Sequence, residues 1–225
     1  MLGTAEWQVV EFSVRVAALS TLLIVAPSLA VAWLLARRRW PGKAIVETLV
    51  ALPLVMPPVA TGLILLRILG RRGPVGGWLH RTFDLDVAFT QRGVVAAMMV
   101  MSAPLLVRAA RVAFEEVNPR YEQVASTLGA RPLRVFFSIT LPLAFRGVVG
   151  GMLLAFARAI GEFGATILLA GNIPGRTTTL SSAIFNAVEL GRDDVAMHLL
   201  AVSVLVAFVA VWVAETVLHR RARTA

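Results

Sequence analysis

Long apolar runs, almost free of charged residues, constrain this chain more than any other feature. A helix that crosses a bilayer needs about 20 consecutive, mostly apolar residues. Five runs approach or exceed this length: Val16–Ala36, Thr48–Leu66, Gly93–Val107, Gly147–Ala170 and Val195–Leu218. The third run is short and must continue past Arg108, whose long side chain can reach the interface. The sequence therefore predicts an all-α, polytopic membrane protein, a single transmembrane domain over residues 1–225 with about five transmembrane helices.

Composition and charge distribution support this prediction. The chain is 58% hydrophobic and 16% charged and has no Cys, which excludes an ordinary soluble domain and a disulfide framework. The net charge of +9 does not indicate nucleic acid binding, because the basic residues lie in short segments beside the apolar runs. Arg37, Arg38, Arg39 and Lys43 follow the first run and predict an N-out, C-in topology by the positive-inside rule. No basic region precedes that run, so we expect it to be retained rather than cleaved as a signal peptide.

Three prolines interrupt the second apolar run. Pro53, Pro57 and Pro58 remove backbone donors, so this helix must bend or break. Carbonyl groups freed by such a break are tolerated in a membrane only against protein or a cavity. We therefore expect this segment, together with Thr61, to line a translocation pathway.

A polar segment, residues 118–142, lies between apolar runs. Asn118 suits a helix N-cap, Pro119 the first helical position and Gly129 the residue just past the helix end, which predicts a helix over Pro119–Leu128. Its apolar residues fall on one face: Tyr121, Val124, Ala125 and Leu128. A helix of this length is only marginally stable alone in water, and we therefore expect the stripe to dock on a partner or on the chain itself.

The same segment resembles the cytoplasmic coupling loop of ABC importer permeases, whose pattern is E-A-A, three residues, Gly, nine residues and I-x-L-P. Gln123, Val124 and Ala125 occupy the E-A-A positions, with two departures from the pattern. Four further residues match its spacing, namely Gly129, Ile139, Leu141 and Pro142. The resemblance implies a type I permease fold in which these residues and Glu122 couple the chain to a separate ATP-hydrolysing subunit.

The fourth apolar run contains two charged residues, Arg158 and Glu162. A charge near the bilayer centre costs about 2.5–3.5 kcal/mol on insertion scales, so such residues are usually paired and functional. They are four residues apart on one helical face, which lets them pair with each other. We expect them, with Phe163 and Thr166, to form a pathway or gate, while a purely structural pair is the alternative.

Three motifs resemble the oxyanion branch of these permeases, and the molybdate permeases in particular: residues 52–59 (LPLVMPPV), 156–166 (FARAIGEFGAT) and 171–177 (GNIPGRT). Sulfate/thiosulfate and tungstate permeases share parts of them and remain alternatives. The resemblance implies two permease copies, two ATP-binding subunits, an external oxyanion-binding protein and a multi-pass location in the lipid of the cytoplasmic (inner) membrane.

Other chemistry finds little support in the sequence. No complete G-x-x-x-x-G-K-[ST] motif occurs, so ATP hydrolysis must reside in another subunit. His80, His198 and His219 are far apart, and no metal site or other cofactor is expected. No nucleophile and base are spaced to act together, which disfavours an intramembrane enzyme, and a channel would need no coupling loop.

Two segments are expected on the external side of the membrane. Residues 70–92 hold four arginines, Arg71, Arg72, Arg81 and Arg92, partly offset by Asp84 and Asp86. They form either an ordinary solvated loop or an anion-attracting one. Residues 171–194 include Leu180, Ile184 and Val188 at intervals of four, which predicts a short amphipathic helix.

Overall fold

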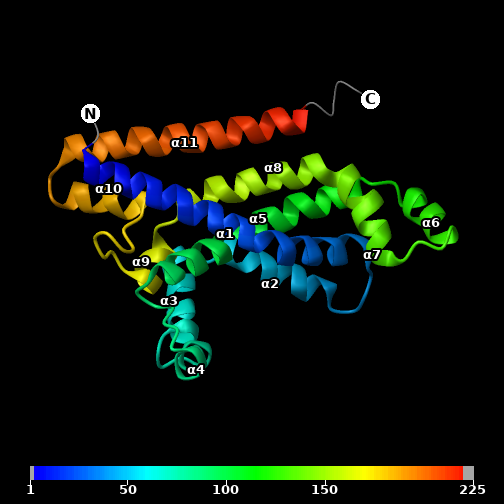
Figure 1. Cartoon of the computed structure of the whole chain (residues 1–225), viewed down its shortest axis with the longest axis horizontal. Coiled ribbons are helices and arrows are strands. Elements are labelled where there is room, and N and C mark those ends of the chain that lie inside the picture. The colour runs from blue at the N-terminus through cyan, green and yellow to red at the C-terminus, as the bar shows by residue number, and fades with distance from the viewer. Residues whose placement is uncertain (1–2, 220–225) are drawn as a thin grey trace.

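The computed structural model describes residues 3–219, and its secondary structure there is entirely helical (Figure 1). The elements are α1 Thr4–Arg37, α2 Lys43–Val55, α3 Pro58–Leu69, α4 Pro74–Phe83, α5 Gln91–Glu115, α6 Pro119–Thr127, α7 Pro132–Val135, the π-helical turn η1 Phe136–Thr140, α8 Leu141–Ile160, α9 Gly164–Ala170, α10 Leu180–Glu189 and α11 Asp193–His219. The predicted all-α class is confirmed.

The long helices form an elongated bundle around α5. Helices α1 and α8 pack on α5, and α11 packs on α8. Buried side chains fill the bundle along its length, with Leu35 and Phe114 in one cluster and Met98 and Ile160 in another. Figure 1 shows the start of α1 and α10 at one end of the long axis and α6 and α7 at the other. These are called the α10 end and the α6 end below.

Four helical segments in the described part of the chain are long and apolar enough to cross a membrane: Glu6–Arg37, Gln91–Glu115, Pro132–Ile160 and Asp193–Thr216. The pair α2 and α3 makes a fifth if it counts as one broken span. The prediction of about five transmembrane helices therefore agrees with the structure. The third run continues past Arg108 to Glu115, as expected.

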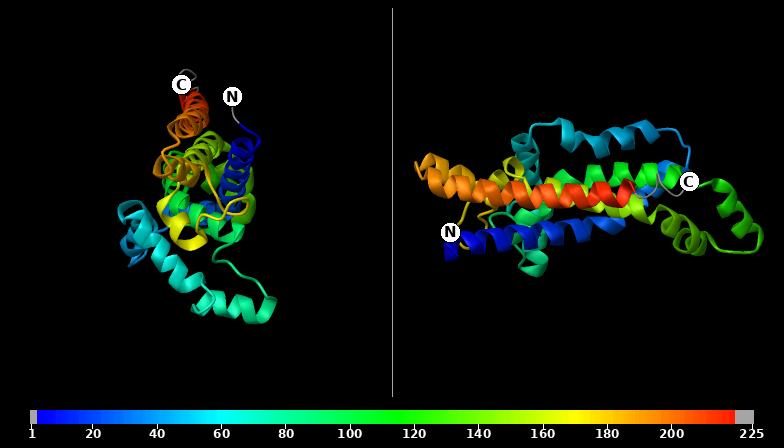
Figure 2. Two further views of the ribbon diagram at one scale, coloured as in Figure 1. Left: turned by 90° about the vertical axis from the view of Figure 1, so that its left-hand side faces the viewer. Right: turned by 90° about the horizontal axis from the view of Figure 1, so that it is seen from above.

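The second run breaks where the prolines predict. Helices α2 and α3 meet at an angle of 113° after Val55, and Pro58 is the first residue of α3. Pro53 lies within α2. Beyond the break, α3 and α4 project sideways from the bundle (Figures 1 and 2).

The fourth run is not one helix, which corrects the sequence prediction. Helix α8 ends at Ile160, and α9 begins at Gly164 after a break over residues 161–163. The prediction that Arg158 and Glu162 share one helical face is therefore wrong, because Glu162 lies between the two helices. The predicted pairing of the two side chains is confirmed, since Arg158 Nη1 lies 2.8 Å from Glu162 Oε2. Outside this run, the amphipathic helix expected in residues 171–194 is present as α10, and its Leu180 is buried.

Candidate functional site

Helix α6 has both of the caps predicted from sequence. The Asn118 side chain accepts a hydrogen bond from the backbone N–H of Arg120 at 3.0 Å. At the other end, Gly129 has a φ of +81°, a left-handed conformation that favours glycine. The Gly129 N–H donates to the carbonyl of Ser126, and the Ala130 N–H donates to that of Ala125. These two bonds form a Schellman motif, which fixes the end of α6 at the predicted glycine.

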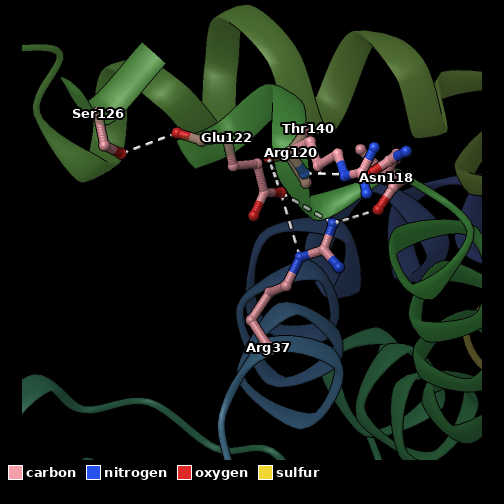
Figure 3. Close-up of polar contacts among 7 residues, drawn as sticks. Arg37, Asn118, Arg120, Glu122, Ser126 and Thr140 are labelled. Carbon is pink, nitrogen blue, oxygen red and sulfur yellow. Dashed lines mark hydrogen bonds and ion pairs between the residues drawn. The ribbon is translucent and has the colours of Figure 1, made fainter. Parts of the chain in front are cut away.

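A polar network ties α6 to the bundle (Figure 3). One carboxylate oxygen of Glu122, Oε1, accepts hydrogen bonds from Arg37 Nε at 3.1 Å, Arg37 Nη2 at 2.9 Å and Thr140 Oγ1 at 2.6 Å. The same Nη2 donates to the carbonyl of Val117 at 2.9 Å. The Arg37 and Glu122 side chains are 14% and 19% exposed, so this ion pair is largely shielded from solvent. It joins the end of α1, the segment after α5, α6 and η1 at one point.

The apolar stripe of α6 faces away from the chain. Tyr121, Val124 and Leu128 are 57%, 59% and 83% exposed, and the fourth residue of the stripe, Ala125, is half-buried. Leu133 and Phe137 add two further exposed apolar side chains in the same segment. No residue of α6, all of which the structure describes, is buried. The alternative in which this helix covers its own protein is therefore disfavoured, because an exposed apolar surface on a polar segment marks an interaction site.

The remaining predicted coupling residues divide into two groups. Gln123 is exposed beside the stripe, and Pro142 is exposed at the start of α8. Ile139 and Leu141 are half-buried, and Leu141 packs against the core cluster at the α6 end. Ile139 belongs to η1, the π-helical turn that also carries Thr140. Local π-helical geometry of this kind is frequent at functional sites.

A second constellation surrounds the break between α8 and α9. Glu162 is fully buried, its Oε1 accepts from the backbone N–H of Ala165 at 2.8 Å, and its Oε2 lies 2.8 Å from Arg158 Nη1. Its carboxylate thus caps the start of α9 and pairs with the end of α8. Thr166 is also buried, and its hydroxyl donates to the carbonyl of Phe163 at 2.8 Å. The Phe163 ring stacks at a tilt on Phe185 of α10, with centroids 5.0 Å apart.

Helix α3 packs closely on α9, which brings the two predicted pathway segments together. A Cβ added at Gly62 would lie 2.8 Å from Ala165 Cα, and one added at Gly164 would lie 2.7 Å from Pro58 Cβ. Both glycines therefore permit a backbone approach that no side chain would allow. Thr61 is buried beside Gly62, and its hydroxyl has no hydrogen-bond partner among the described residues.

Of the predicted pathway residues, Pro58 touches α9 directly, while Pro53 lies within α2 and Pro57 is exposed at the break.

Sequence reasoning missed the contacts of Arg37 and Thr140 with Glu122. In the sequence, Arg37 served only to predict the topology by the positive-inside rule, and no pattern indicated that it pairs with Glu122. Within residues 3–219, no group of three or more His, Asp or Glu residues is placed to hold a metal ion.

These features define a polytopic membrane component with an exposed amphipathic helix at one end and a packed helix break in its interior. Residues 28–224 match the family described as binding-protein-dependent transport system inner membrane components, and the chain belongs to this family. The resemblance noted from its motifs is confirmed at this level.

Similar proteins include the molybdenum transport system permease protein ModB of Escherichia coli K12, with 45% identity over 96% of this chain and 94% of the relative. ModB of Haemophilus influenzae is 39% identical over 93% and 92% of the two chains. The sulfate transport system permease protein CysT of Escherichia coli K12 is 38% identical over 80% of this chain and 66% of that protein.

Solved structures share the fold at low sequence identity. A chain of a bacterial alginate ABC transporter, in complex with an alginate-bound periplasmic protein, aligns with a TM-score of 0.72 and 19% identity over 99% of this chain and 81% of its own length. The MetNI methionine ABC transporter, in an inward-facing conformation, aligns with a TM-score of 0.63 and 14% identity over 95% and 94%. The fold is therefore that of ABC importer permeases.

Proposed function

We propose that this chain is the membrane-spanning subunit of an ATP-driven importer that carries molybdate across the cytoplasmic (inner) membrane. The observation that carries this proposal is the 45% identity to a molybdenum permease over 96% of the chain. The chain's own motifs at residues 52–59, 156–166 and 171–177 point to the same oxyanion branch.

The coupling segment, residues 118–142, is the proposed contact with an ATP-binding subunit. Its exposed stripe of Tyr121, Val124 and Leu128 supplies apolar area, and the caps at Asn118 and Gly129 fix the length of the helix. The Arg37–Glu122 pair gives this helix a rigid connection to α1. A displacement of α6 by the ATPase would therefore pull on the end of a helix that runs the length of the bundle.

The proposed orientation puts the α6 end inside and the α10 end outside. Four basic residues, Arg37, Arg38, Arg39 and Lys43, lie around the end of α1, and Arg37 contacts α6 directly. The positive-inside rule favours the cytoplasm for such a cluster. The N-terminus is then outside, the C-terminus inside, and an external oxyanion-binding protein meets the α10 end.

A second copy of the chain is the proposed partner for α2 and α3. Helix α2 has no buried residue, and its Ile45, Leu49 and Val55 are 64%, 61% and 81% exposed. The exposed side chains of α3, such as Val59 and Leu63, extend this apolar surface toward the packed break. Two copies joined through these helices would enclose a pathway lined by α3 and α9, served by two ATP-binding subunits. Exposed apolar residues of α11, including Phe208 and Trp212, are then left to face lipid.

Glu162, Phe163 and Thr166 are the proposed gate, together with Thr61 and the prolines at the α2–α3 break. The break leaves a short helix, α9, whose position depends on one carboxylate and on close packing against α3. Relative movement of α3 and α9 would open or close the pathway without bending a long helix.

Reconstitution tests this proposal. The chain, its ATP-binding subunit and its binding protein are placed in vesicles, and uptake of molybdate, tungstate and sulfate is measured with and without ATP. We expect uptake to depend on ATP, and molybdate to be taken up in strong preference to sulfate when both are present. Preferred uptake of sulfate would make the chain a sulfate/thiosulfate permease, the alternative supported by its similarity to CysT. Uptake that needs neither ATP nor partner would instead indicate a channel.

A further inference from the structure

A basic hollow lies where α3 ends and the chain turns into α4. Its volume is about 680 Å³, and its charged lining consists of Arg67, Arg71, Arg72 and Asp86, with Phe89 at one side. Three cations and one anion give the lining a formal charge of +2 (3 − 1). The three arginine residues are exposed to solvent.

The single carboxylate of the hollow is already engaged. Asp86 accepts two hydrogen bonds from Arg71, at 3.1 Å to Nε and 3.0 Å to Nη2, in a bidentate pair. His80 Nδ1 lies 3.3 Å from the same carboxylate. Arg67 and Arg72 have no hydrogen-bond or ion-pair partner among the described residues. Asp86 and Arg71 therefore hold the wall in place, and two guanidinium groups are left to bind an anion.

The segments that line the hollow contact α9, a helix of the proposed gate. Helix α3, which carries Arg67, packs on α9. The backbone N–H of Phe89, on the opposite wall, donates to the carbonyl of Leu169 in α9 at 3.0 Å. Phe89 has a φ of +57°, and its ring lies against Gly171. Both walls of the hollow thus contact α9 or the residue that ends it, so an anion held here lies beside the helix proposed to move.

We propose that Arg67 and Arg72 form a collecting site for a tetrahedral oxyanion on the outer side of the pathway. Planar guanidinium groups bind tetrahedral oxyanions through paired N–H donors, and a net charge of +2 matches a doubly charged anion such as molybdate. The site rests on the proposed function and deepens it. It holds the oxyanion that the binding protein releases and limits its loss to the outside before the gate opens.

The headgroup of an anionic phospholipid offers the same negatively charged, tetrahedral phosphate chemistry. Trp78 and Phe83 of α4 stack edge to face at 5.5 Å and are 53% and 56% exposed, as expected for a helix at a membrane interface. The experiment must therefore separate free oxyanion from lipid.

The test compares two double variants in the reconstituted complex with its ATPase and molybdate-loaded binding protein. R67Q/R72Q removes two charges from the hollow, and R81Q/R92Q removes two charges from the same outer region but not from its lining. We expect molybdate taken up per ATP hydrolysed to fall about five- to ten-fold in R67Q/R72Q, the loss expected for close solvent-exposed charge interactions. It should stay within about two-fold in R81Q/R92Q, because screened charges outside the hollow contribute little. R67K/R72K should retain an intermediate value.

Stimulation of ATP hydrolysis by loaded binding protein should be the same in all variants. This second measurement distinguishes a failure of the collecting site from a failure of the proposed function. If wild-type protein shows no such stimulation, the proposed function fails rather than the collecting site. Vesicles of phosphatidylcholine alone are compared with vesicles that also contain phosphatidylglycerol. A defect in both assigns the site to free oxyanion, and a defect only with phosphatidylglycerol assigns it to the anionic lipid headgroup. Equal uptake by the two glutamine double variants would overturn the proposal.

Discussion

The coupling segment and the α3–α9 contact are attached to the chain in different ways. Helix α6 buries none of its residues and is held to the bundle through the Glu122 carboxylate and the short chain on either side. Helix α9 is shorter, yet Ala165, Thr166 and Leu169 are buried, and glycines at its contacts bring backbones together. The surface proposed to accept another subunit is left open, and a polar contact connects it to the bundle. The contact proposed to line the pathway is determined by packing, so we expect it to tolerate fewer changes.

The largest effect is expected at Glu162. Glu162→Lys places a second cation beside Arg158 and removes the acceptor of the Ala165 N–H. Breaking a buried ion pair by removing one partner costs about 3–5 kcal/mol. We expect little assembled protein in membranes and no uptake, measured by quantitative blotting and transport.

The swapped variant R158E/E162R sharpens this prediction. It restores opposite charges but cannot restore the cap on α9, because Arg has no acceptor. Uptake should therefore remain low. Full recovery in the swap would mean that only the charge pairing matters and that the helix break does not depend on the cap.

The Arg37–Glu122 pair should give the next largest effect, of a different kind. Hydrogen bonds to charged groups contribute about 1.5–3 kcal/mol. Arg37→Ala or Glu122→Ala should leave membrane insertion intact but reduce stimulated ATP hydrolysis and uptake. Because the two residues share one ion pair, the loss in the double variant should be smaller than the sum of the two single losses. Additive losses in this cycle would show that the two side chains act independently.

Two glycines near the break offer a matched comparison with a smaller effect. A Cβ at Gly164 would meet Pro58 Cβ at 2.7 Å, whereas at Gly161 the nearest atom is 3.9 Å away. Overpacking costs about 1–3 kcal/mol. Gly164→Ala should lower the melting temperature of the purified protein and its transport rate, and Gly161→Ala should change neither. Similar behaviour of the two variants would contradict the close α3–α9 contact.

The smallest effect is expected at Gly129, which has open space around it but a φ of +81°. A left-handed conformation costs another residue about 1–2 kcal/mol. Gly129→Val should insert normally but show a modest reduction in stimulated ATP hydrolysis, with Gly129→Ala in between because it lacks a β-branch. Gly42→Val is the control, because Gly42 has a φ of +90° and equally open space but lies outside the coupling segment. Equal loss of coupling in both valine variants would remove any special role for α6.

Local signals in the sequence were sufficient for much of this fold. Asn118, Pro119 and Gly129 predict α6 because caps depend on neighbouring residues, and Pro57 and Pro58 predict the α2–α3 break because proline removes backbone donors. The break after Ile160 was missed. Only the structure shows that the Glu162 carboxylate caps the start of a new helix.

Contacts between distant segments could not be predicted in the same way. Arg37 and Glu122 are 85 positions apart, and Glu122 and Thr140 are 18 apart. Their meeting depends on how α1, α5 and η1 pack, and no spacing in the sequence encodes this packing. The collecting site is a similar case, because it needs the end of α3 and residues 86–89 to face each other. The sequence showed only that this region is basic.

The exposed stripe of α6 is the proposed contact with the ATP-binding subunit. A photoreactive residue at Leu128, 83% exposed, tests it directly in membranes that contain the assembled complex. The same residue at Phe185, 47% exposed on α10, is the control at the opposite end. We expect Leu128 to crosslink to the ATP-binding subunit and Phe185 not to do so. A crosslink from Phe185 but none from Leu128 would contradict the proposed docking site and the orientation that goes with it.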